Sequence, residues 1–161
     1  MARTPQIGQV PPDFTLQGIE VVGGAATTAE YTLSQQRGRP VVLAFYPGDN
    51  TAVCTKQLCS YTSGLDSFAG LGATIWAISP QGLDSHEQFA RKFALAFPLL
   101  ADTGLDVSRQ YGITLGNAGL RRSVFVLDAS GVLRWKHVTL VGLTFPSTQV
   151  ISDQLAALQA A

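Results

Sequence analysis

The sequence predicts an α/β fold in which helices flank a central mixed β-sheet. Residues 39–47 (RPVVLAFYP) and 73–79 (ATIWAIS) are continuous apolar runs, which are typical of strands buried on both faces. A segment with helical character follows each run. Residues 123–138 have the pattern of two strands about a short turn, and such a hairpin is antiparallel. Strands that alternate with helices and end in this hairpin predict both parallel and antiparallel pairs.

The N-terminal part is predicted to add a strand and a hairpin to this sheet. Residues 5–16 are extended and punctuated by prolines, and they end in an alternating strand. Residues 20–33 are predicted to form a hairpin about a Gly-Gly pair. After the first apolar run, a Gly-Asp-Asn turn leads to Thr51, which we expect to cap a helix that runs towards Phe68.

The C-terminal half continues the alternation. An amphipathic helix is predicted over residues 85–95, a short strand over 97–102 and a short helix over 105–113. The last predicted helix covers residues 147–159, and four side chains are expected on its apolar face: Val150, Ile151, Leu155 and Leu158. Without an internal repeat or a linker, residues 1–161 are predicted to form one domain of the thioredoxin-like type, with the order of the strands left open.

Composition argues against several classes of function. Apolar residues make up 46% of the 161-residue chain and charged residues 14%, as in a globular protein, and the formal net charge is zero. A nucleic-acid-binding protein usually has a basic excess. No apolar run approaches the length of about 18 residues that a membrane span needs. The N-terminal residues show no apolar core of a secretory signal, so we expect a cytoplasmic protein without nucleic-acid or membrane partners.

The two cysteines of the chain, Cys54 and Cys59, lie five residues apart in one short segment. A metal clip, a structural disulfide and a pair of redox-active thiols are the three explanations. Cys54 follows a buried strand, a turn and a cap residue, so it falls in the first turn of the predicted helix. Free N–H groups and the positive end of the helix dipole favour a thiolate at such a position. A buried, inert cysteine is the alternative for Cys54.

The spacing of the cysteines bears on all three explanations. On an ideal helix, residues five apart have Cα atoms roughly 8.6 Å apart. A disulfide needs Cα atoms within about 6.8 Å, which disfavours a permanent bond and allows a reversible one if the helix unwinds. The residues that follow, Ser-Tyr-Thr-Ser-Gly, are weak helix formers. The spacing is not that of a zinc site, and neither His86 nor His137 is close in sequence. It is also not the Cys-x-x-Cys spacing of dithiol reductases.

Residues 46–59 (YPGDNTAVCTKQLC) match the Pro-x-x-x-Thr/Ser-x-x-Cys signature of peroxiredoxins, with Pro47, Thr51 and Cys54 in register. Cys59 resembles the resolving cysteine of the bacterioferritin-comigratory (Q-type) subfamily. Three further segments resemble the family: residues 7–16, 77–102 and 121–133. Counted back from Phe-Val-Leu-Asp, the active-site arginine of the family falls on Arg122.

The resemblance implies a thioredoxin-like fold and the reduction of hydrogen peroxide and organic hydroperoxides without a metal, haem or flavin cofactor. Cys54 would attack the peroxide and become a sulfenic acid. Thr51, backbone N–H groups and Arg122 would hold the substrate, and Pro47 would shield the sulfenic acid. Cys59 would then form a disulfide with Cys54, and thioredoxin or a similar dithiol would reduce it. The resemblance also implies a monomer.

Some residues depart from the usual pattern of the subfamily. Gln57 stands where glutamate is common, and Ala52 where proline is frequent. A thiol–disulfide oxidoreductase and a non-enzymatic redox sensor or chaperone on the same fold are the alternative functions. Three other polar residues are interpreted as non-catalytic: Arg121 as a solvated charge, His86 as a surface residue or cap partner, and His137 as exposed on a strand.

Overall fold

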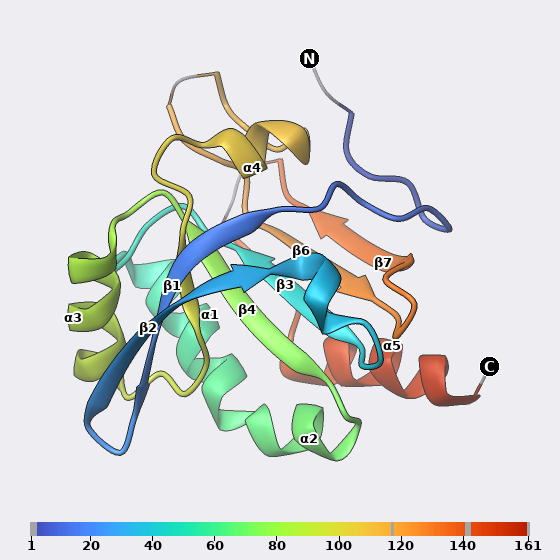
Figure 1. Ribbon diagram of the computed structural model, residues 1–161, viewed down its shortest axis with the longest axis horizontal. Coiled ribbons are helices and arrows are strands. Elements are labelled where there is room, and N and C mark those ends of the chain that lie inside the picture. The colour runs from blue at the N-terminus through green and yellow to red at the C-terminus, as the bar shows by residue number, and fades with distance from the viewer. Residues whose placement is uncertain (1–2, 117, 141–142, 161) are drawn as a thin grey trace.

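The structure is a computed structural model that describes residues 3–116, 118–140 and 143–160. Its centre is a seven-stranded sheet with the order β2-β1-β5-β4-β3-β6-β7 (Figure 1). The strands are β1 (Thr15–Val22), β2 (Ala25–Thr32), β3 (Val41–Phe45), β4 (Thr74–Ser79), β5 (Leu99–Ala101), β6 (Ser123–Leu127) and β7 (Leu133–Val138). β4 is parallel to β3 and β5, and the other pairs are antiparallel. The predicted mixed sheet is therefore confirmed.

Helices cover both faces of this sheet (Figure 1). They are the 3-10 helix η1 (Leu33–Gln36) and the α-helices α1 (Ala52–Ser63), α2 (Leu65–Gly70), α3 (Leu83–Phe93), α4 (Asp106–Gln110) and α5 (Thr148–Ala160). One apolar cluster joins the sheet to α1, α2, α3 and α5, and a second joins it to η1, α4 and the N-terminal segment. Side chains of β3 alternate between the clusters, with Val42 in the first and Leu43 in the second. This explains why the run at 39–47 is apolar throughout.

The N-terminal hairpin forms as predicted, but the strand that was expected before it is not a separate strand, because β1 already begins at Thr15. β1 and β2 pair over their full lengths, from Thr15 opposite Thr32 to Val22 opposite Ala25. Gly23 and Gly24 make the turn with φ of 57° and 82°, a conformation that glycine adopts without the steric cost of a side chain. β1 also pairs with β5, which attaches the hairpin to the central sheet.

The helix predicted from Thr51 towards Phe68 is broken at Gly64. α1 ends at Ser63 and α2 starts at Leu65. A Cβ atom on Gly64 would lie 2.0 Å from Cγ2 of Thr148, at the start of α5, so only glycine allows this close approach. The prediction for α5 was also partly wrong, because Ile151 and Leu155 are buried but Val150 is 39% exposed.

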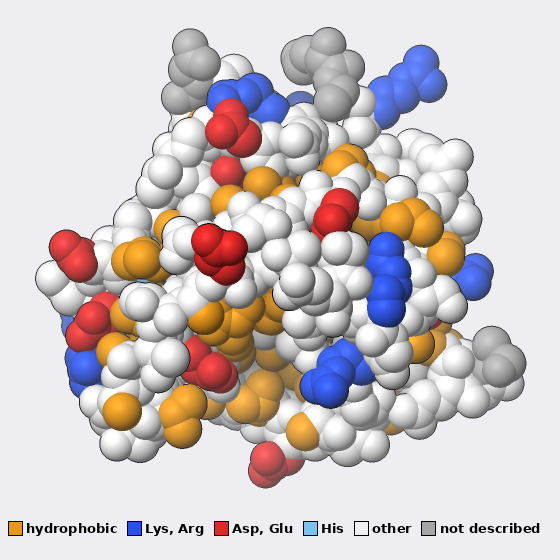
Figure 2. Space-filling view, viewed as in Figure 1, with side chains coloured by type: hydrophobic (Ala, Val, Ile, Leu, Met, Phe, Trp, Pro, Cys, Tyr) orange, Lys and Arg blue, Asp and Glu red, His pale blue; other side chains and the backbone are white. Residues whose placement is uncertain are grey.

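The surface carries both signs of charge. Figure 2 shows acidic and basic side chains spread over one face, with apolar side chains between them. Within the described residues, no helix is both long and apolar enough to cross a membrane.

Candidate active site around Cys54

The loop after β3 places Cys54 at the start of α1. Cys54 is fully buried and lies in the first turn of the helix, as predicted. Thr51 precedes α1 in an extended conformation, which is the expected cap position. Its side chain makes no cap hydrogen bond and instead donates from Oγ1 to the Gly48 carbonyl at 2.9 Å. The first-turn N–H groups of α1 are therefore not capped by Thr51 Oγ1.

Arg122 reaches the sulfur of Cys54 from the position directly before β6. β6 pairs with β3 so that Ser123 lies opposite Phe45, and this register brings Arg122 to the end of β3 where the Cys54 loop begins. Its Nη2 donates to Cys54 Sγ at 3.2 Å, and the side chain is almost fully buried. The Arg122 carbonyl accepts hydrogen bonds from the Thr139 amide and hydroxyl, which fixes the backbone of this arginine.

Gln57 binds the second terminal nitrogen of the Arg122 guanidinium. Arg122 Nη1 donates to Gln57 Oε1. Gln57 Nε2 donates to the Tyr61 hydroxyl at 3.3 Å, and that hydroxyl donates to the Pro146 carbonyl at 2.7 Å. Burial raises the pKa of Tyr61, so its hydroxyl keeps its proton and remains a donor. Because Gln57 is neutral, it orients Arg122 without placing a negative charge beside the sulfur.

Cys59 lies further along α1. It is partly buried and packs against the same apolar cluster as Cys54, and both cysteines are free thiols. Burial raises the pKa of the Cys59 thiol. Within the described ranges, no group of three His, Cys, Asp or Glu side chains could hold a metal ion.

Pro47 and Arg121 lie on the border of a small pocket. It has a volume of about 200 Å³, and its other walls include Leu115, Leu120 and Leu140. Arg121 borders this pocket while Arg122 contacts Cys54, so the adjacent arginines diverge as predicted, although both lie just before β6 and not within it. The interpretation of Arg121 as a solvated charge was partly wrong, because its Nε is buried and has no hydrogen-bond partner among the described residues.

The sequence did not predict a buried ion pair that joins the loop after β3 to α3. His86 Nδ1 lies 2.7 Å from Asp49 Oδ2, and the two side chains are 0% and 1% exposed. The interpretation of His86 as a surface residue was therefore wrong. Helical periodicity contained the signal, because His86 is three residues before the buried Phe89 and lies on the same face of α3. His137 is only half-buried on β7 and stacks on Trp135.

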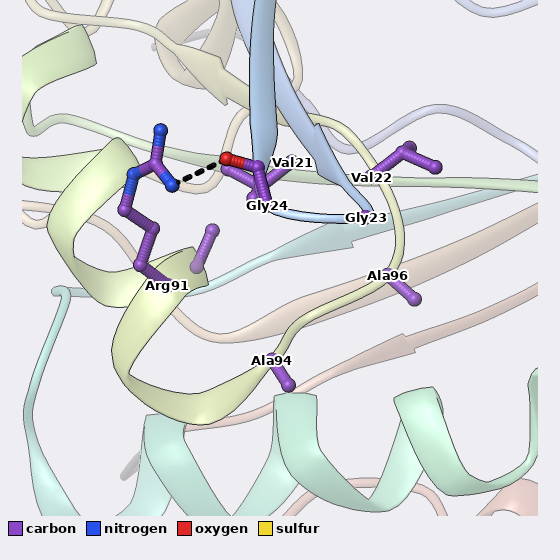
Figure 3. A pocket seen from close by; sticks show the side chains of 8 residues that line it. Val21, Val22, Gly23, Gly24, Arg91, Ala94 and Ala96 are labelled. Carbon is purple, nitrogen blue, oxygen red and sulfur yellow. Dashed lines mark hydrogen bonds between the residues drawn. The ribbon is translucent and has the colours of Figure 1, made fainter.

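A larger pocket lies away from these residues, between the β1–β2 hairpin and the C-terminal end of α3 (Figure 3). Its volume is about 530 Å³, and its walls include Val21, Val22 and Ala94. Arg91 lines one side and donates from Nη1 to the Gly24 carbonyl at 2.7 Å. None of the residues that we predicted for the site borders this pocket.

The fold and the site together define a class of protein. A buried cysteine lies in the first turn of a helix that follows a strand of a mixed sheet, and a guanidinium donates to its sulfur. This is the arrangement that a thiol-based redox site on a thioredoxin-like scaffold requires.

The comparisons with known proteins give the family. The AhpC/TSA family model matches residues 7–136, and the chain belongs to this family. The chain is 37% identical over 129 residues to "Peroxiredoxin Q, chloroplastic" of Sedum lineare, and these residues make up 79% of this chain and 66% of that protein. It is also 37% identical to the protein of the same name from Triticum aestivum, over 80% of this chain and 57% of that one. The resemblance to Q-type peroxiredoxins is thus confirmed, and the chain spans less than two thirds of these relatives.

Solved structures support the fold. The reduced 2-Cys peroxiredoxin of Plasmodium vivax superposes with a TM-score of 0.88 at 22% sequence identity, over 97% of this chain and 83% of that one. At this identity the likeness establishes the fold, which is the thioredoxin-like peroxiredoxin fold that the sequence predicted.

Proposed function

We propose that this chain is a thiol-dependent peroxidase that reduces hydrogen peroxide and organic hydroperoxides. The observation that carries the proposal is the contact between Arg122 Nη2 and the buried Cys54 Sγ, at 3.2 Å, in the first turn of α1. A cation and a helix N-terminus at one sulfur stabilise its thiolate, which is the nucleophile. Membership of the AhpC/TSA family supports this assignment.

The first step forms an S–O bond and breaks the O–O bond. The Cys54 thiolate attacks one peroxide oxygen, and the other oxygen leaves with the bonding electrons and takes up a proton. Arg122 and the first-turn N–H groups of α1 donate to the oxygens while negative charge moves onto the leaving group. Thr51 Oγ1 donates to Gly48 and retains lone pairs that can accept from the peroxide O–H. Pro47, beside the loop, limits access of water to the sulfenic acid that results.

The second step joins Cys59 to Cys54. The Cys59 sulfur attacks the sulfenic acid sulfur, the S–S bond forms, and the hydroxyl leaves as water. A dithiol of the thioredoxin type then reduces the disulfide by exchange. Since both cysteines lie in α1, the helix must open between them before they can bond. We further propose, from the sequence, that the protein acts as a monomer in the cytoplasm.

Single cysteine variants test the proposal by intact mass after one equivalent of peroxide. We expect Cys54→Ser to lose peroxidase activity, and Cys59→Ser to react once and keep one added oxygen on Cys54. Loss of the first reaction in Cys59→Ser, with its retention in Cys54→Ser, would reverse the two roles.

Turnover separates the alternative functions. With a dithiol reductant, a peroxidase consumes many equivalents of peroxide per protein. A redox sensor or chaperone would stop after one equivalent, and a thiol–disulfide oxidoreductase would reduce insulin disulfides and leave peroxide unchanged. Sedimentation of the reduced and oxidised protein tests the monomer, and fluorescent tagging of the chain tests its location.

A further inference from the structure

The buried pair of Asp49 and His86 takes no part in the chemistry above. It lies between the loop of residues 47–51 and the first turn of α3. Asp49 belongs to the loop that carries Pro47 and Thr51, and its side chain is held by Tyr46, directly before the loop, and by α3. The Asp49 carboxylate accepts hydrogen bonds from the Tyr46 hydroxyl at 2.6 Å and from Ser85 Oγ at 2.7 Å, and it lies 2.7 Å from His86 Nδ1.

The surroundings of the carboxylate determine where its proton lies. Burial alone would raise the pKa of Asp49, but this pKa is held below its usual value. The hydroxyl groups of Tyr46 and Ser85 both donate to the carboxylate, and these two hydrogen bonds favour its ionised form whichever form His86 takes. Asp49 is therefore ionised, and an ionised carboxylate only accepts hydrogen bonds. The hydrogen between Asp49 Oδ2 and His86 Nδ1 must belong to the histidine.

The second ring nitrogen of His86 also faces an acceptor. Nε2 lies 3.0 Å from the Leu100 carbonyl of β5, which has lone pairs and no hydrogen to offer. The Tyr46 hydroxyl is 3.5 Å from Nδ1, and its own hydrogen is directed to Asp49. A neutral imidazole carries one N–H, whereas this site requires two. His86 is therefore an imidazolium.

Tyr46 connects the pair to the reactive cysteine. It belongs to the same apolar cluster as Cys54. Burial, the charge and hydrogen bond of Asp49 and the nearby Cys54 all act to raise the pKa of Tyr46 well above its usual value, so the hydroxyl stays a donor to Asp49. Charges on Asp49 and on Cys54 therefore act on a common neighbour, and an uncancelled carboxylate here would oppose a thiolate at Cys54.

We propose that His86 is a positioning residue for the peroxidase site: as an imidazolium it fixes the loop of residues 47–51 through Asp49 and cancels the charge of this carboxylate near Cys54. The inference rests on the proposed function. The loop has further constraints, since the Asp49 amide donates to Gln81 Oε1 at 3.0 Å and Asn50 has a φ of 60°. Loss of the His86 proton would leave one net negative charge buried in this loop.

Nitrogen-15 NMR of the wild-type protein tests the protonation directly and without any assay of peroxidase activity. The chain has two histidines, and His137→Gln assigns their signals. We expect both ring nitrogens of His86 to carry hydrogen at neutral pH. A His86 ring with one unprotonated nitrogen would overturn the proposal even if the chain is a peroxidase. Asp49→Asn should convert His86 to a neutral ring, and a ring that stayed doubly protonated would also overturn it.

Variants in a Cys59→Ser background test the effect on Cys54 through ultraviolet thiolate absorbance and the rate with hydrogen peroxide. His86→Gln should reduce the thiolate absorbance of Cys54 and slow its reaction with hydrogen peroxide about tenfold at neutral pH. The double variant Asp49→Asn/His86→Gln should recover most of both losses, because no carboxylate remains to be cancelled. His137→Gln is the matched control and should leave both quantities unchanged. An unchanged thiolate absorbance of Cys54 in His86→Gln would show that His86 does not cancel a charge near Cys54. A double variant that reacts as slowly as His86→Gln would show the same.

Discussion

At the scale of single residues, Arg122 is the side chain that donates a hydrogen bond to the Cys54 sulfur in the proposed site. Its guanidinium is planar and rigid, and it donates from Nη2 to the Cys54 sulfur and from Nη1 to Gln57 Oε1. A lysine ammonium at this position would keep the positive charge but not the planar group, so it could not donate to Cys54 and Gln57 in the same geometry. Charge and geometry can therefore be separated by a conservative substitution.

We expect Arg122→Lys to slow the reaction of Cys54 with hydrogen peroxide by about 10²-fold, because one oriented donor to the developing charge is lost. Stopped-flow measurement under single-turnover conditions gives this rate. Arg121→Lys is the matched control, since Arg121 points to the pocket beside Pro47 and not to the sulfur. Equal losses in both variants would remove the assignment of Arg122.

A motif and a strand register predicted Pro47, Thr51, Cys54 and Arg122 as site residues, and the structure brings Arg122 to the sulfur of Cys54. The sequence could not identify the partners that lie far away in the chain. Asp49 and His86 are 37 residues apart, and their contact depends on how β4 and α3 follow β3 in space. A local pattern shows that His86 faces inwards but does not show which carboxylate it meets.

At the scale of elements, the break between α1 and α2 shows where local patterns were insufficient. Weak helix formers around residue 64 were visible in the sequence, but the close packing of Gly64 against Thr148 of α5 was not. Strand types and the hairpin were predicted correctly, because apolar runs and a Gly-Gly turn encode them locally. The strand order depends on long-range pairing, such as β1 with β5, and no local pattern encodes it.

Gly64→Ala should lower the free energy of unfolding by about 1–3 kcal/mol, because the new methyl group would overlap Thr148 Cγ2. Urea unfolding measures the change. Thr148→Ser removes that methyl group and should recover much of the loss in the double variant. Gly70→Ala, whose Cβ would meet no atom within 4 Å, is the matched control and should not destabilise the protein. A Gly64→Ala protein as stable as the wild type would mean that the helix break does not depend on this contact.

At the scale of the whole molecule, α1 links the candidate active site to the C-terminal helix α5. The Tyr61 hydroxyl donates to the Pro146 carbonyl, and Thr148 Oγ1 donates to the Ser60 carbonyl at 3.2 Å. Ser60 and Tyr61 directly follow Cys59 in sequence. If α1 opens to bring Cys59 to Cys54, their contacts with the start of α5 are therefore expected to break. The strands β3 and β4 are held by parallel pairing in the middle of the sheet and do not depend on these contacts.

This arrangement predicts how local stability changes with the redox state. The cysteines can bond only if α1 unwinds, so residues 51–64 should exchange amide hydrogens markedly faster in the disulfide form than in the dithiol form. The first turn of α5 should lose protection with them, because its contacts to Ser60 and Tyr61 break when α1 opens. Residues 41–46 and 74–79 should stay protected in both forms.

Hydrogen exchange measured by mass spectrometry tests this prediction. The control is Cys59→Ser treated with the same oxidant, because this variant cannot form the disulfide. Equal protection of residues 51–64 in the two forms would mean that the helix never opens, and the resolution of Cys54 by Cys59 would have to be abandoned.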